Sequence, residues 1–535
     1  DPRRRQRRSV EELLAQVSEP REREVIRQAY GIVGQPHHLS VHPGGLVITP
    51  GPLTDVVPVQ WAPKGFLITQ FDHQGVEAVG LPKLDLLGIS ALTVIADTAD
   101  LIRRRHDRTF DPATIPLDDP KTGELLARGD TVGVFQCESE GARKTLRQLQ
   151  ATSVRDLAVA NAFFKPGPAT GGMAQHFVRR YRGEEAVSFL HPALEPILGP
   201  TQGVLLFQEQ ILRVATEIAG LSWAQADHLR RGMSKFQPEE MTRLRETFIQ
   251  GCRRPAPAGP AFSRPQAETL WEQVVAFSGY GFNQGHATAY ADVSYRLAYL
   301  KTHWPAELLC ARLVNPGGFH HQAIYLAEAV RLGIEVRPPH INHSRTAFVL
   351  SPDNILWMGL GQVRDLRRAA VKAIIPARRE RQFTDLRDLL ARVELQAKEV
   401  THLIQGGALD GLGDSRAALL AELAGLGAAG SALQLALPFD RPATASETVA
   451  QRFSWERFGL GLPVSVTPLA TITQPPPNAT PLARLPELAG RAVTVLAIDY
   501  RVGPVAPVFI WGMARPLCWR EAVSRSSRRR PGNPW

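Results

Sequence analysis

The 535-residue sequence predicts an α+β protein with several domains. Residues 40–95 contain short apolar runs separated by Pro and Gly, which is typical of strands. Residues 96–310 instead place apolar side chains at helical spacing. The length is sufficient for roughly three or four domains. Hydrophobic residues make up 44% and charged residues 21% of the chain, which is the composition of a globular protein and not of a disordered one.

The N-terminal part is predicted to contain one helix followed by strands. Apolar residues at helical spacing predict a helix over residues 9–30. Three apolar runs bounded by Pro and Gly predict strands: GGLVI (44–48), GFLITQF (65–71) and GLPKLDLLGI (80–89).

The remaining segments alternate helices, turns and linkers. Gly-rich turns, KPGPATGG (165–172) and YGFNQGH (280–286), interrupt the helical region, and residues 345–415 read as short helices separated by glycines. The Ala/Gly/Leu-rich stretch 421–450 and the Pro-rich stretch 471–484 are predicted linkers. RAVTVLAIDYRV (491–502) is rich in β-branched residues and predicts a strand.

Composition excludes several classes of protein. No run of 18 apolar residues occurs, so no membrane span or membrane partner is expected. No secretory signal is visible at the start, and the four scattered cysteines have no zinc spacing, which favours reduced cysteines in the cytoplasm. The net charge of +10 is concentrated in residues 1–8 and 520–535, which carry +4 each. Charge alone therefore does not establish a DNA partner.

The segment around Asp85 carries the first chemical signal. Its carboxylate interrupts an apolar strand, and a buried carboxylate is costly unless it is paired or binds a metal. Side chains alternate along a strand, so Lys83 and Asp85 share one face. Together they suit a metal-bound phosphate, with Asp85 as a hard oxygen ligand. A simple buried Lys–Asp pair is the alternative, and spacing alone favours it.

Longer motifs decide between these two interpretations. HHLSVHPGGLVITPGPL (37–53) and ITQFDHQGVEAVGLPKLDLLGISALTVI (68–95) resemble the palm of bacterial DNA polymerase III alpha subunits, which are C-family DNA polymerases. The likeness covers roughly residues 10–470 and continues through PLDDPKTGELLARGDTVGVFQCESEGARKTL (116–146), NAFFKPGPATGGM (161–173), GVLLFQEQIL (203–212), ADHLRRGMSKFQPEEM (226–241), FSGYGFNQGHATAYADVSY (277–295) and LKTHWPAELL (300–309). Motifs of this length in one order are highly specific.

The resemblance implies two-metal nucleotidyl transfer from dNTPs to a primer 3′-hydroxyl, with two Mg²⁺ ions in the complete site. Asp85 matches the third catalytic aspartate of the family and would be a metal ligand, and Lys83 would lie near the triphosphate. His42, Gly44 and Gly45 resemble the nucleotide-proximal turn of the palm, where small residues let the backbone approach phosphate.

Further nucleotide and DNA contacts are implied in the mainly α-helical fingers. Lys165, Arg230 and Arg231 are expected to contact the nucleotide, with Lys235 on the DNA. Arg231 and Lys235 are expected on one helical face at i,i+4. Asn283 and His286 are implied to lie near the nascent base pair. For all of these, solvated or structurally satisfied side chains are the alternative.

Two glycine-punctuated segments, GLGQV (359–363) and QGGALDGLG (405–413), resemble tandem helix-hairpin-helix units. Their glycines would expose amide groups to DNA phosphates. The implied DNA-binding residues are Gly359, Gly361, Gly406, Gly407, Gly411 and Gly413. Glycines that merely cap helices are the alternative.

The peptide QLALPF resembles a sliding-clamp-binding motif, with Gln434, Leu437 and Phe439 as its anchors; a chance match in a linker is the alternative. WERFGLGLPVSVTPL (455–469) resembles the family's link to an OB-fold. Only 33 residues follow residue 502, whereas an OB-fold needs about five strands, so an incomplete OB-like region is expected.

The resulting domain prediction is a thumb remnant (1–36), the C-terminal part of a mixed-sheet palm (37–95), fingers (96–330), a helix-hairpin-helix region (331–420), a linker with the clamp peptide (421–484) and an OB-like region with a basic tail (485–535). The family's other two catalytic aspartates lie in a Pro-Asp-x-Asp motif, which these 535 residues lack.

That absence suggests an N-terminally truncated polymerase, or one half of a split polymerase that acts with a separate N-terminal half. A non-catalytic DNA- and clamp-binding remnant is the alternative. Motif spelling favours the error-prone branch, acting in translesion DNA repair beside other mutagenesis proteins, over the main replicative subunit. The expected partners are primer-template DNA, dNTPs and the sliding clamp.

Overall fold

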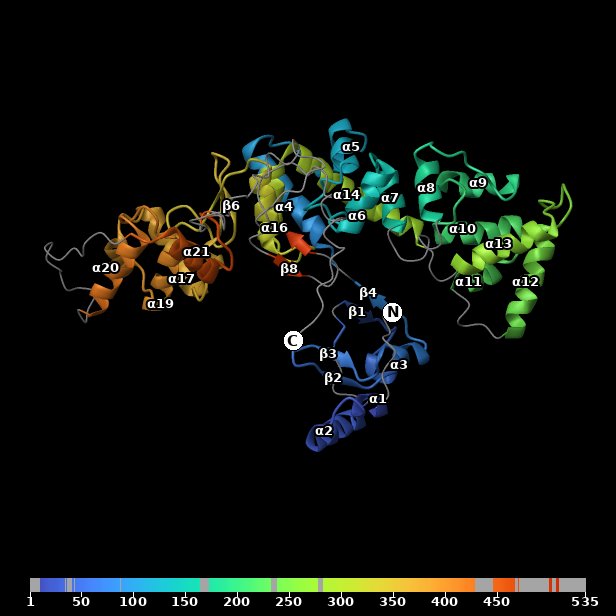
Figure 1. Cartoon of the computed structure of the whole chain (residues 1–535), viewed down its shortest axis with the longest axis horizontal. Coiled ribbons are helices and arrows are strands. Elements are labelled where there is room, and N and C mark those ends of the chain that lie inside the picture. Colours follow the sequence, from blue (N-terminus) through green and yellow to red (C-terminus); the bar gives the residue numbers. More distant parts are fainter. Residues whose placement is uncertain are drawn as a thin grey trace. The chain divides into compact units, whose positions relative to one another are not determined.

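The computed structural model describes residues 10–33, 35, 41–42, 44–86, 88–163, 173–231, 238–277, 282–428, 446–466, 470, 500–502 and 507–509. The chain divides into two compact units, residues 1–89 and 90–535 (Figure 1). The division falls at the start of helix α4 (Ser90–Arg105), so the predicted palm range 37–95 runs into this helix.

The first unit begins with two short helices where one was predicted. Helix α1 (Val10–Leu14) ends before Pro20, and α2 (Pro20–Gly31) starts at that proline. The Glu19 side chain caps α2 by accepting the Glu22 N–H at 2.9 Å. A proline cannot donate to the preceding turn but is well suited to the first position of a helix, so the predicted single helix breaks here.

Two antiparallel ribbons follow, where a mixed palm sheet was expected. Strand β1 (Gly45–Val47) pairs with β4 (Lys83–Asp85), and β2 (Val59–Trp61) pairs with β3 (Leu67–Thr69). Helix α3 (His73–Ala78) leads into β4. Alternation puts Leu46 opposite Leu84 on one face of the first ribbon, and both side chains are exposed. The ribbon therefore has one apolar and one polar face.

The second unit is mainly helical over residues 90–331, as predicted. Its long central helix is α14 (Gln284–His303), which packs against α4, α5 (Pro120–Ala127), α7 (Val154–Phe163) and α15 (Pro305–Val314). This region also contains α6 (Glu140–Leu149), α8 (Met173–Tyr181) and α16 (Gln322–Arg331). The buried Lys301 of α14 donates to Glu328 of α16 at 2.6 Å, which ties these two helices together.

Residues 190–277 build a separate apolar cluster from α9 (Glu195–Leu198), α10 (Gln208–Arg213), α11 (Trp223–Arg231), α12 (Pro238–Cys252) and α13 (Arg264–Phe277). Val214–Ile218 extend α10 as a π-helical turn. Fully buried Leu229 and Phe248 belong to this core, and Leu229 fixes the face of α11 that carries Arg230.

The region after α16 contains a sheet that the sequence did not predict. Strand β7 (Leu356–Trp357) lies between β5 (Val336–Arg337), which is parallel to it, and β6 (Val349–Leu350), which is antiparallel. Residues of these strands share one apolar core with helices α17 (Arg368–Glu380), α18 (Leu386–Arg392), α19 (Ala397–Gln405) and α20 (Arg416–Ala428). Two-residue strands give too short a pattern to be recognised in a sequence.

Helix α21 (Val449–Leu460) joins this domain through a buried ion pair. Arg416 of α20 donates to Glu456 of α21 at 2.9 Å and to both Asp410 oxygens at 2.7 Å. Beyond α21 the structure describes little: β8 (Tyr500–Val502) pairs with β9 (Pro507–Phe509), and β8 coincides with the end of the predicted strand 491–502. Among the described residues, no helix is both long and apolar enough to cross a bilayer.

Candidate functional site

The β1–β4 ribbon brings the predicted palm residues onto its polar face. Asp85 lies directly opposite Gly45, and Lys83 lies opposite Val47. The Lys83 Nζ donates to both oxygens of Asp85, at 2.8 and 2.9 Å. The prediction that these two side chains share a face is confirmed.

The environment of Asp85 differs from the buried one that was predicted. Its side chain is 44% exposed, because Leu84 and Leu86 are themselves exposed and do not enclose the strand. The hydrogen bond from Lys83 is the main cause that lowers the pKa of the Asp85 carboxyl, and the charge of Lys83 adds to it. Asp85 is thus an ionised, accessible oxygen donor.

His42 and its glycines surround the same carboxylate. The His42 Nδ1 accepts the Gly44 N–H at 3.2 Å and lies 3.7 Å from the Asp85 Oδ1. A Cβ atom on Gly45 would lie only 3.0 Å from that Nδ1, so a larger residue would press on the imidazole. The turn implied by the resemblance therefore adjoins Asp85.

The donor set fits Mg²⁺ only in part. Among the described residues, no group of three or more His, Cys, Asp or Glu side chains converges as a metal site. Mg²⁺ commonly takes one or two carboxylates and completes its shell with water and substrate phosphates. Asp85 would supply one such carboxylate, and Lys83 lies close enough to neutralise a phosphate beside it.

The fingers residues gather around the first turn of α10. Arg230, near the end of α11, donates to Asp227 at 2.9 Å and to the Gln208 Oε1 at 3.2 Å. Asn283 caps α14 by accepting the His286 N–H at 2.7 Å, and the His286 ring lies 4.0 Å from that of Tyr290. Arg231 is the last residue of α11, whereas Lys165 and Lys235 lie outside the described residues.

Sequence reasoning missed Gln208 and Glu209 in this cluster. The Glu209 carboxylate accepts the Gln284 N–H at 2.9 and 3.1 Å, and the Gln208 N–H donates to the Phe282 carbonyl at 2.9 Å. The available signal was the polar triplet in LLFQEQIL, which interrupts an apolar run at a helix start.

The glycines predicted to bind DNA occupy turns, but several of their amides are already used. Gly406 and Gly407 follow α19, and their N–H groups donate to His402 and Ile404 at 2.9 and 3.0 Å. The Gly361 N–H donates to Thr346 at 2.9 Å. Phosphate contacts through these three amides would require the internal bonds to break, which corrects the expectation of open donors.

The remaining predicted glycines have other surroundings. Gly359 follows strand β7 and not a helix, and a Cβ there would collide with the Thr346 carbonyl at 2.4 Å. Gly411 has a φ of +84°, and a Cβ added there would meet nothing within 4 Å, whereas Gly413 packs on Leu419. Of the six glycines, Gly411 is the one in an open turn that a backbone partner could approach.

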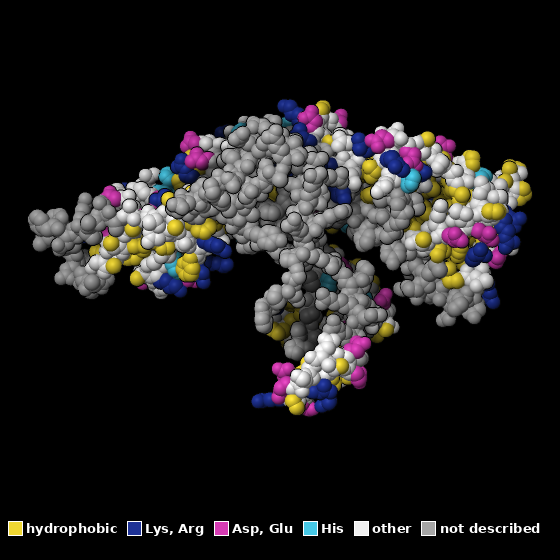
Figure 2. Space-filling view, in the orientation of Figure 1, with side chains coloured by type: hydrophobic (Ala, Val, Ile, Leu, Met, Phe, Trp, Pro, Cys, Tyr) yellow, Lys and Arg dark blue, Asp and Glu magenta, His cyan; other side chains and the backbone are white. Residues whose placement is uncertain are grey.

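Positive charge collects beside this turn instead. The Ile341 N–H donates to Ala408 at 2.8 Å, which places the loop that follows β5 next to residues 406–413. Burial and the nearby charges of Arg345 and Arg379 lower the pKa of Arg378. Figure 2 shows Lys and Arg side chains on the surface near α17. Such mutual repulsion is relieved when a polyanion binds.

Arg337 belongs to the same cationic cluster, and the His343 imidazole lies beside it. Burial and the charges of Arg378 and Arg337 lower the pKa of His343, whose ring stacks on Trp357 at 4.8 Å. These residues come from three separated segments, so no single motif in the sequence could have revealed the cluster. Gln434, Leu437 and Phe439 of the clamp peptide lie outside the described residues.

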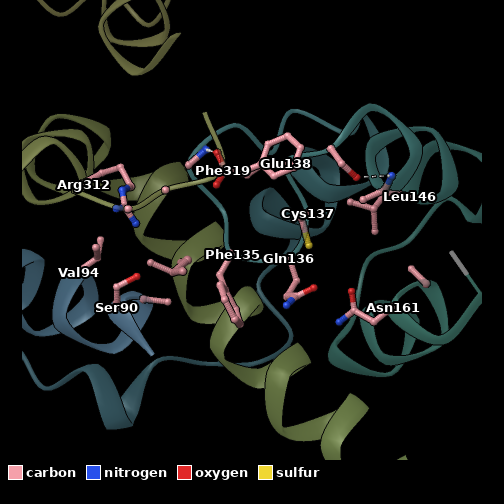
Figure 3. A pocket seen from close by; sticks show the side chains of 18 residues that line it. Ser90, Val94, Phe135, Gln136, Cys137, Glu138, Leu146, Asn161, Arg312 and Phe319 are labelled. Atoms are coloured by element: carbon pink, nitrogen blue, oxygen red, sulfur yellow. Dashed lines mark hydrogen bonds between the residues drawn. The ribbon is translucent and has the colours of Figure 1, made fainter. Parts of the chain in front are cut away.

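A cavity of about 430 Å³ lies within the fingers, between α4, α6, α7 and α15 (Figure 3). Burial raises the pKa of the Cys137 thiol to about 12, so this cysteine is not a nucleophile at neutral pH. In Figure 3 Arg312 and Asn161 stand on opposite sides of the cavity. Their Nε and Nδ2 atoms are buried without a hydrogen-bond acceptor among the described residues.

Comparisons with known proteins agree with this arrangement. Residues 3–88 match the bacterial DNA polymerase III alpha NTPase domain, residues 91–255 match the bacterial DNA polymerase III alpha subunit finger domain, and residues 333–419 match a helix-hairpin-helix motif. The first two are domains of one class of nucleic-acid enzyme, and the helix-hairpin-helix motif follows them in the order expected from the resemblance.

Several individual relatives are called DNA polymerase III subunit alpha. The chain is 39% identical to that of Thermus aquaticus over 428 residues, which cover 77% of this chain and 34% of the relative. It is 36% identical to those of Bacillus subtilis (75% and 36% covered) and Escherichia coli K12 (75% and 35% covered). The chain belongs to the bacterial DNA polymerase III alpha subunit family and spans about a third of the length of these relatives.

Proposed function

We propose that this chain supplies the third catalytic aspartate, the nucleotide-binding fingers and a DNA-gripping domain of a DNA-directed DNA polymerase. The observation that carries the proposal is the polar face of the β1–β4 ribbon, where Asp85, Lys83 and His42 meet. Its substrates are dNTPs and primer-template DNA. The reaction is nucleotidyl transfer to a primer 3′-hydroxyl.

Each residue on this face has a definable task. Mg²⁺, when bound, lowers the pKa of the attacking hydroxyl and neutralises the leaving phosphates. Asp85 offers an ionised carboxylate, and the hydrogen bond from Lys83 lowers its pKa further below the ordinary value. When a triphosphate arrives, the Lys83 ammonium can turn from Asp85 to a phosphate oxygen, and the carboxylate is then free to bind the metal.

The DNA-binding part of the proposal rests on the cationic cluster beside the 406–413 turn. Arg337, Arg345, Arg378 and Arg379 would neutralise phosphates without reading the base sequence. Gly411 is the backbone position best placed to approach the duplex closely. Sliding-clamp binding through Gln434, Leu437 and Phe439 remains part of the proposal.

Two measurements test the active site. The full chain alone should not extend a primer, because it lacks the Pro-Asp-x-Asp motif. Primer extension by the full chain mixed with the N-terminal polymerase region of the Thermus aquaticus relative should fall about 1,000-fold or more in Asp85→Asn. The exposed Asp55→Asn in the same unit is the matched control. Binding of the fluorescent nucleotide mant-dATP with Mg²⁺ to the full chain should weaken in Lys83→Met and not in Lys64→Met.

A second candidate function is a DNA- and clamp-binding protein without catalysis. It predicts that the chain binds duplex DNA but not mant-dATP, and that Asp85→Asn changes nothing. The absence of a three-ligand metal group among the described residues is the observation in its favour.

The cellular role within the family is a finer proposal. The residues of the motifs HLSVHPGGLVI and WERFGLGLPVS favour a role in error-prone translesion synthesis. A role as the main replicative polymerase agrees at least as well with the relatives, which are called DNA polymerase III subunit alpha. Extension across a template abasic site separates the two. Efficient bypass supports the error-prone role, and arrest one nucleotide before the lesion supports the replicative one.

A further inference from the structure

The first turn of α10 contains three polar residues that serve different partners. Gln210 is buried and anchors the helix, because its Oε1 accepts the N–H groups of Leu206 and Phe207 at 2.8 and 2.9 Å. Gln208 and Glu209 reach outward, one to each neighbouring helix. The turn is thus anchored by Gln210 while it contacts α11 of the same apolar cluster and the start of α14.

Gln208 holds the guanidinium of Arg230 through a neutral acceptor. Its Oε1 lies 3.2 Å from the Arg230 Nη1, while Asp227 takes the Nε of the same arginine at 2.9 Å. Asp227 already forms an ion pair with this guanidinium at 2.8 Å, and the Gln208 amide orients it further without adding a second negative charge. Arg230 is only about a quarter exposed, so its direction is well defined.

Glu209 holds the start of α14. Both its oxygens accept the N–H of Gln284, the first residue of that helix, at 2.9 and 3.1 Å. The backbone of Phe207 also bridges to that of Phe282, one residue before Asn283. An acceptor here satisfies an otherwise unpaired helix N–H and fixes where Asn283 and α14 begin.

We propose that Gln208 and Glu209 are positioning residues that set Arg230 and the N-terminus of α14 at one fixed spacing around the incoming nucleotide. This inference rests on the proposed function of the fingers, in which the family resemblance implies that Arg230 contacts the nucleotide and Asn283 lies near the nascent base pair. Without Gln208 the Arg230 guanidinium would lose one acceptor, and without Glu209 the first N–H of α14 would lose its carboxylate, so both nucleotide contacts would be placed less precisely.

Equilibrium titration of the full chain with mant-dATP and Mg²⁺ tests the proposal. Gln208→Glu is nearly isosteric but adds a charge that engages Arg230, and it should weaken binding about fivefold. Gln208→Ala should weaken it about threefold. Glu209→Ala should weaken binding about threefold, whereas Glu209→Gln keeps an acceptor and should rescue binding to near the wild-type value.

A matched control lies four residues beyond the helix. Glu217 forms an exposed ion pair with Arg213 at 2.7 Å, and Glu217→Ala should leave nucleotide binding unchanged. Hydrogen exchange gives a second readout that needs no nucleotide. Glu209→Ala should accelerate exchange at residues 284–287, and Glu209→Gln should not.

The outcomes separate this inference from the function on which it rests. If the wild-type chain does not bind mant-dATP, or if Arg230→Ala binds it normally, the nucleotide site is wrong and the inference falls with it. If Arg230→Ala weakens binding while Gln208→Glu and Glu209→Ala do not, positioning alone is refuted. Failure of Glu209→Gln to rescue Glu209→Ala would also overturn it.

Discussion

Replacing Arg416 with Met should loosen the junction between the 406–413 turn and helix α21. The Arg416 side chain is only 1% exposed and donates to Asp410 on one side and Glu456 on the other. Its guanidinium also explains Gly407, where a Cβ would lie 2.4 Å from the Arg416 Nη2. The substitution leaves Glu456, which is fully buried, without its cation.

The size of the effect follows from that unpaired carboxylate. Removing one partner of a buried ion pair costs about 3–5 kcal/mol. Glu456 would keep its bonds from the amides of Val464 and Ser465, at 2.6 and 2.9 Å, so the lower end applies. A cost of about 3 kcal/mol raises the equilibrium constant for local opening about 150-fold.

Hydrogen exchange measured by mass spectrometry is the suitable assay, because a multidomain chain has no single unfolding transition. Peptides covering residues 397–428 and 449–466 should exchange about 150-fold faster in Arg416→Met. Arg387→Met, which breaks an exposed pair with Glu422 in the same domain, should change exchange less than about threefold. An equally small change in Arg416→Met would refute the reasoning.

Two further outcomes are expected. Arg367 holds the pKa of the buried Glu399 at about 2, below its ordinary 4.5; because the folded value is the lower one, its stabilisation is complete above pH 4.5 and is lost as the pH falls towards 2. After correction for intrinsic rates, the free energy that protects residues 397–405 from exchange should therefore fall by about 2–3 kcal/mol as the pH is lowered across that range. Glu399→Gln should abolish this pH dependence. Gly45→Ala should displace His42 and weaken mant-dATP binding about threefold, whereas Gly51→Ala, where a Cβ meets nothing within 4 Å, should not.

The sequence was most informative where one short segment contained the whole pattern. Alternation alone predicted that Lys83 and Asp85 share a face, and helical spacing predicted the mainly helical region after residue 96. The apolar residues around Asp85 wrongly predicted that its carboxylate is buried, because the leucines of a two-stranded ribbon stay exposed. The periodicity of apolar residues predicted a single helix over residues 9–30, whereas Pro20 marks the start of a second helix.

Contacts between distant segments could not be predicted. Gln208 meets Arg230 and Glu209 meets Gln284, although 22 and 75 positions separate these pairs. Arg416 and Glu456 are 40 positions apart, and no local pattern marks either as a partner of the other. Spacing within one helix or strand is a property of the backbone, whereas these pairs depend on how the helices pack.

The two-faced β1–β4 ribbon makes the candidate site unusually sensitive to the length of the chain before it. If one residue were deleted between α3 and Lys83 and the loop of residues 79–82 did not shorten to compensate, the strand would shift along β1 by one position. Every side chain would then change sides, with the carboxylate and ammonium exchanged for the aliphatic residues between them. A deletion of one residue with this shift would move the polar side chains of β4 to the opposite face of the ribbon. Conservative replacements of Leu46 or Leu84 on the apolar face would leave the geometry of the site intact.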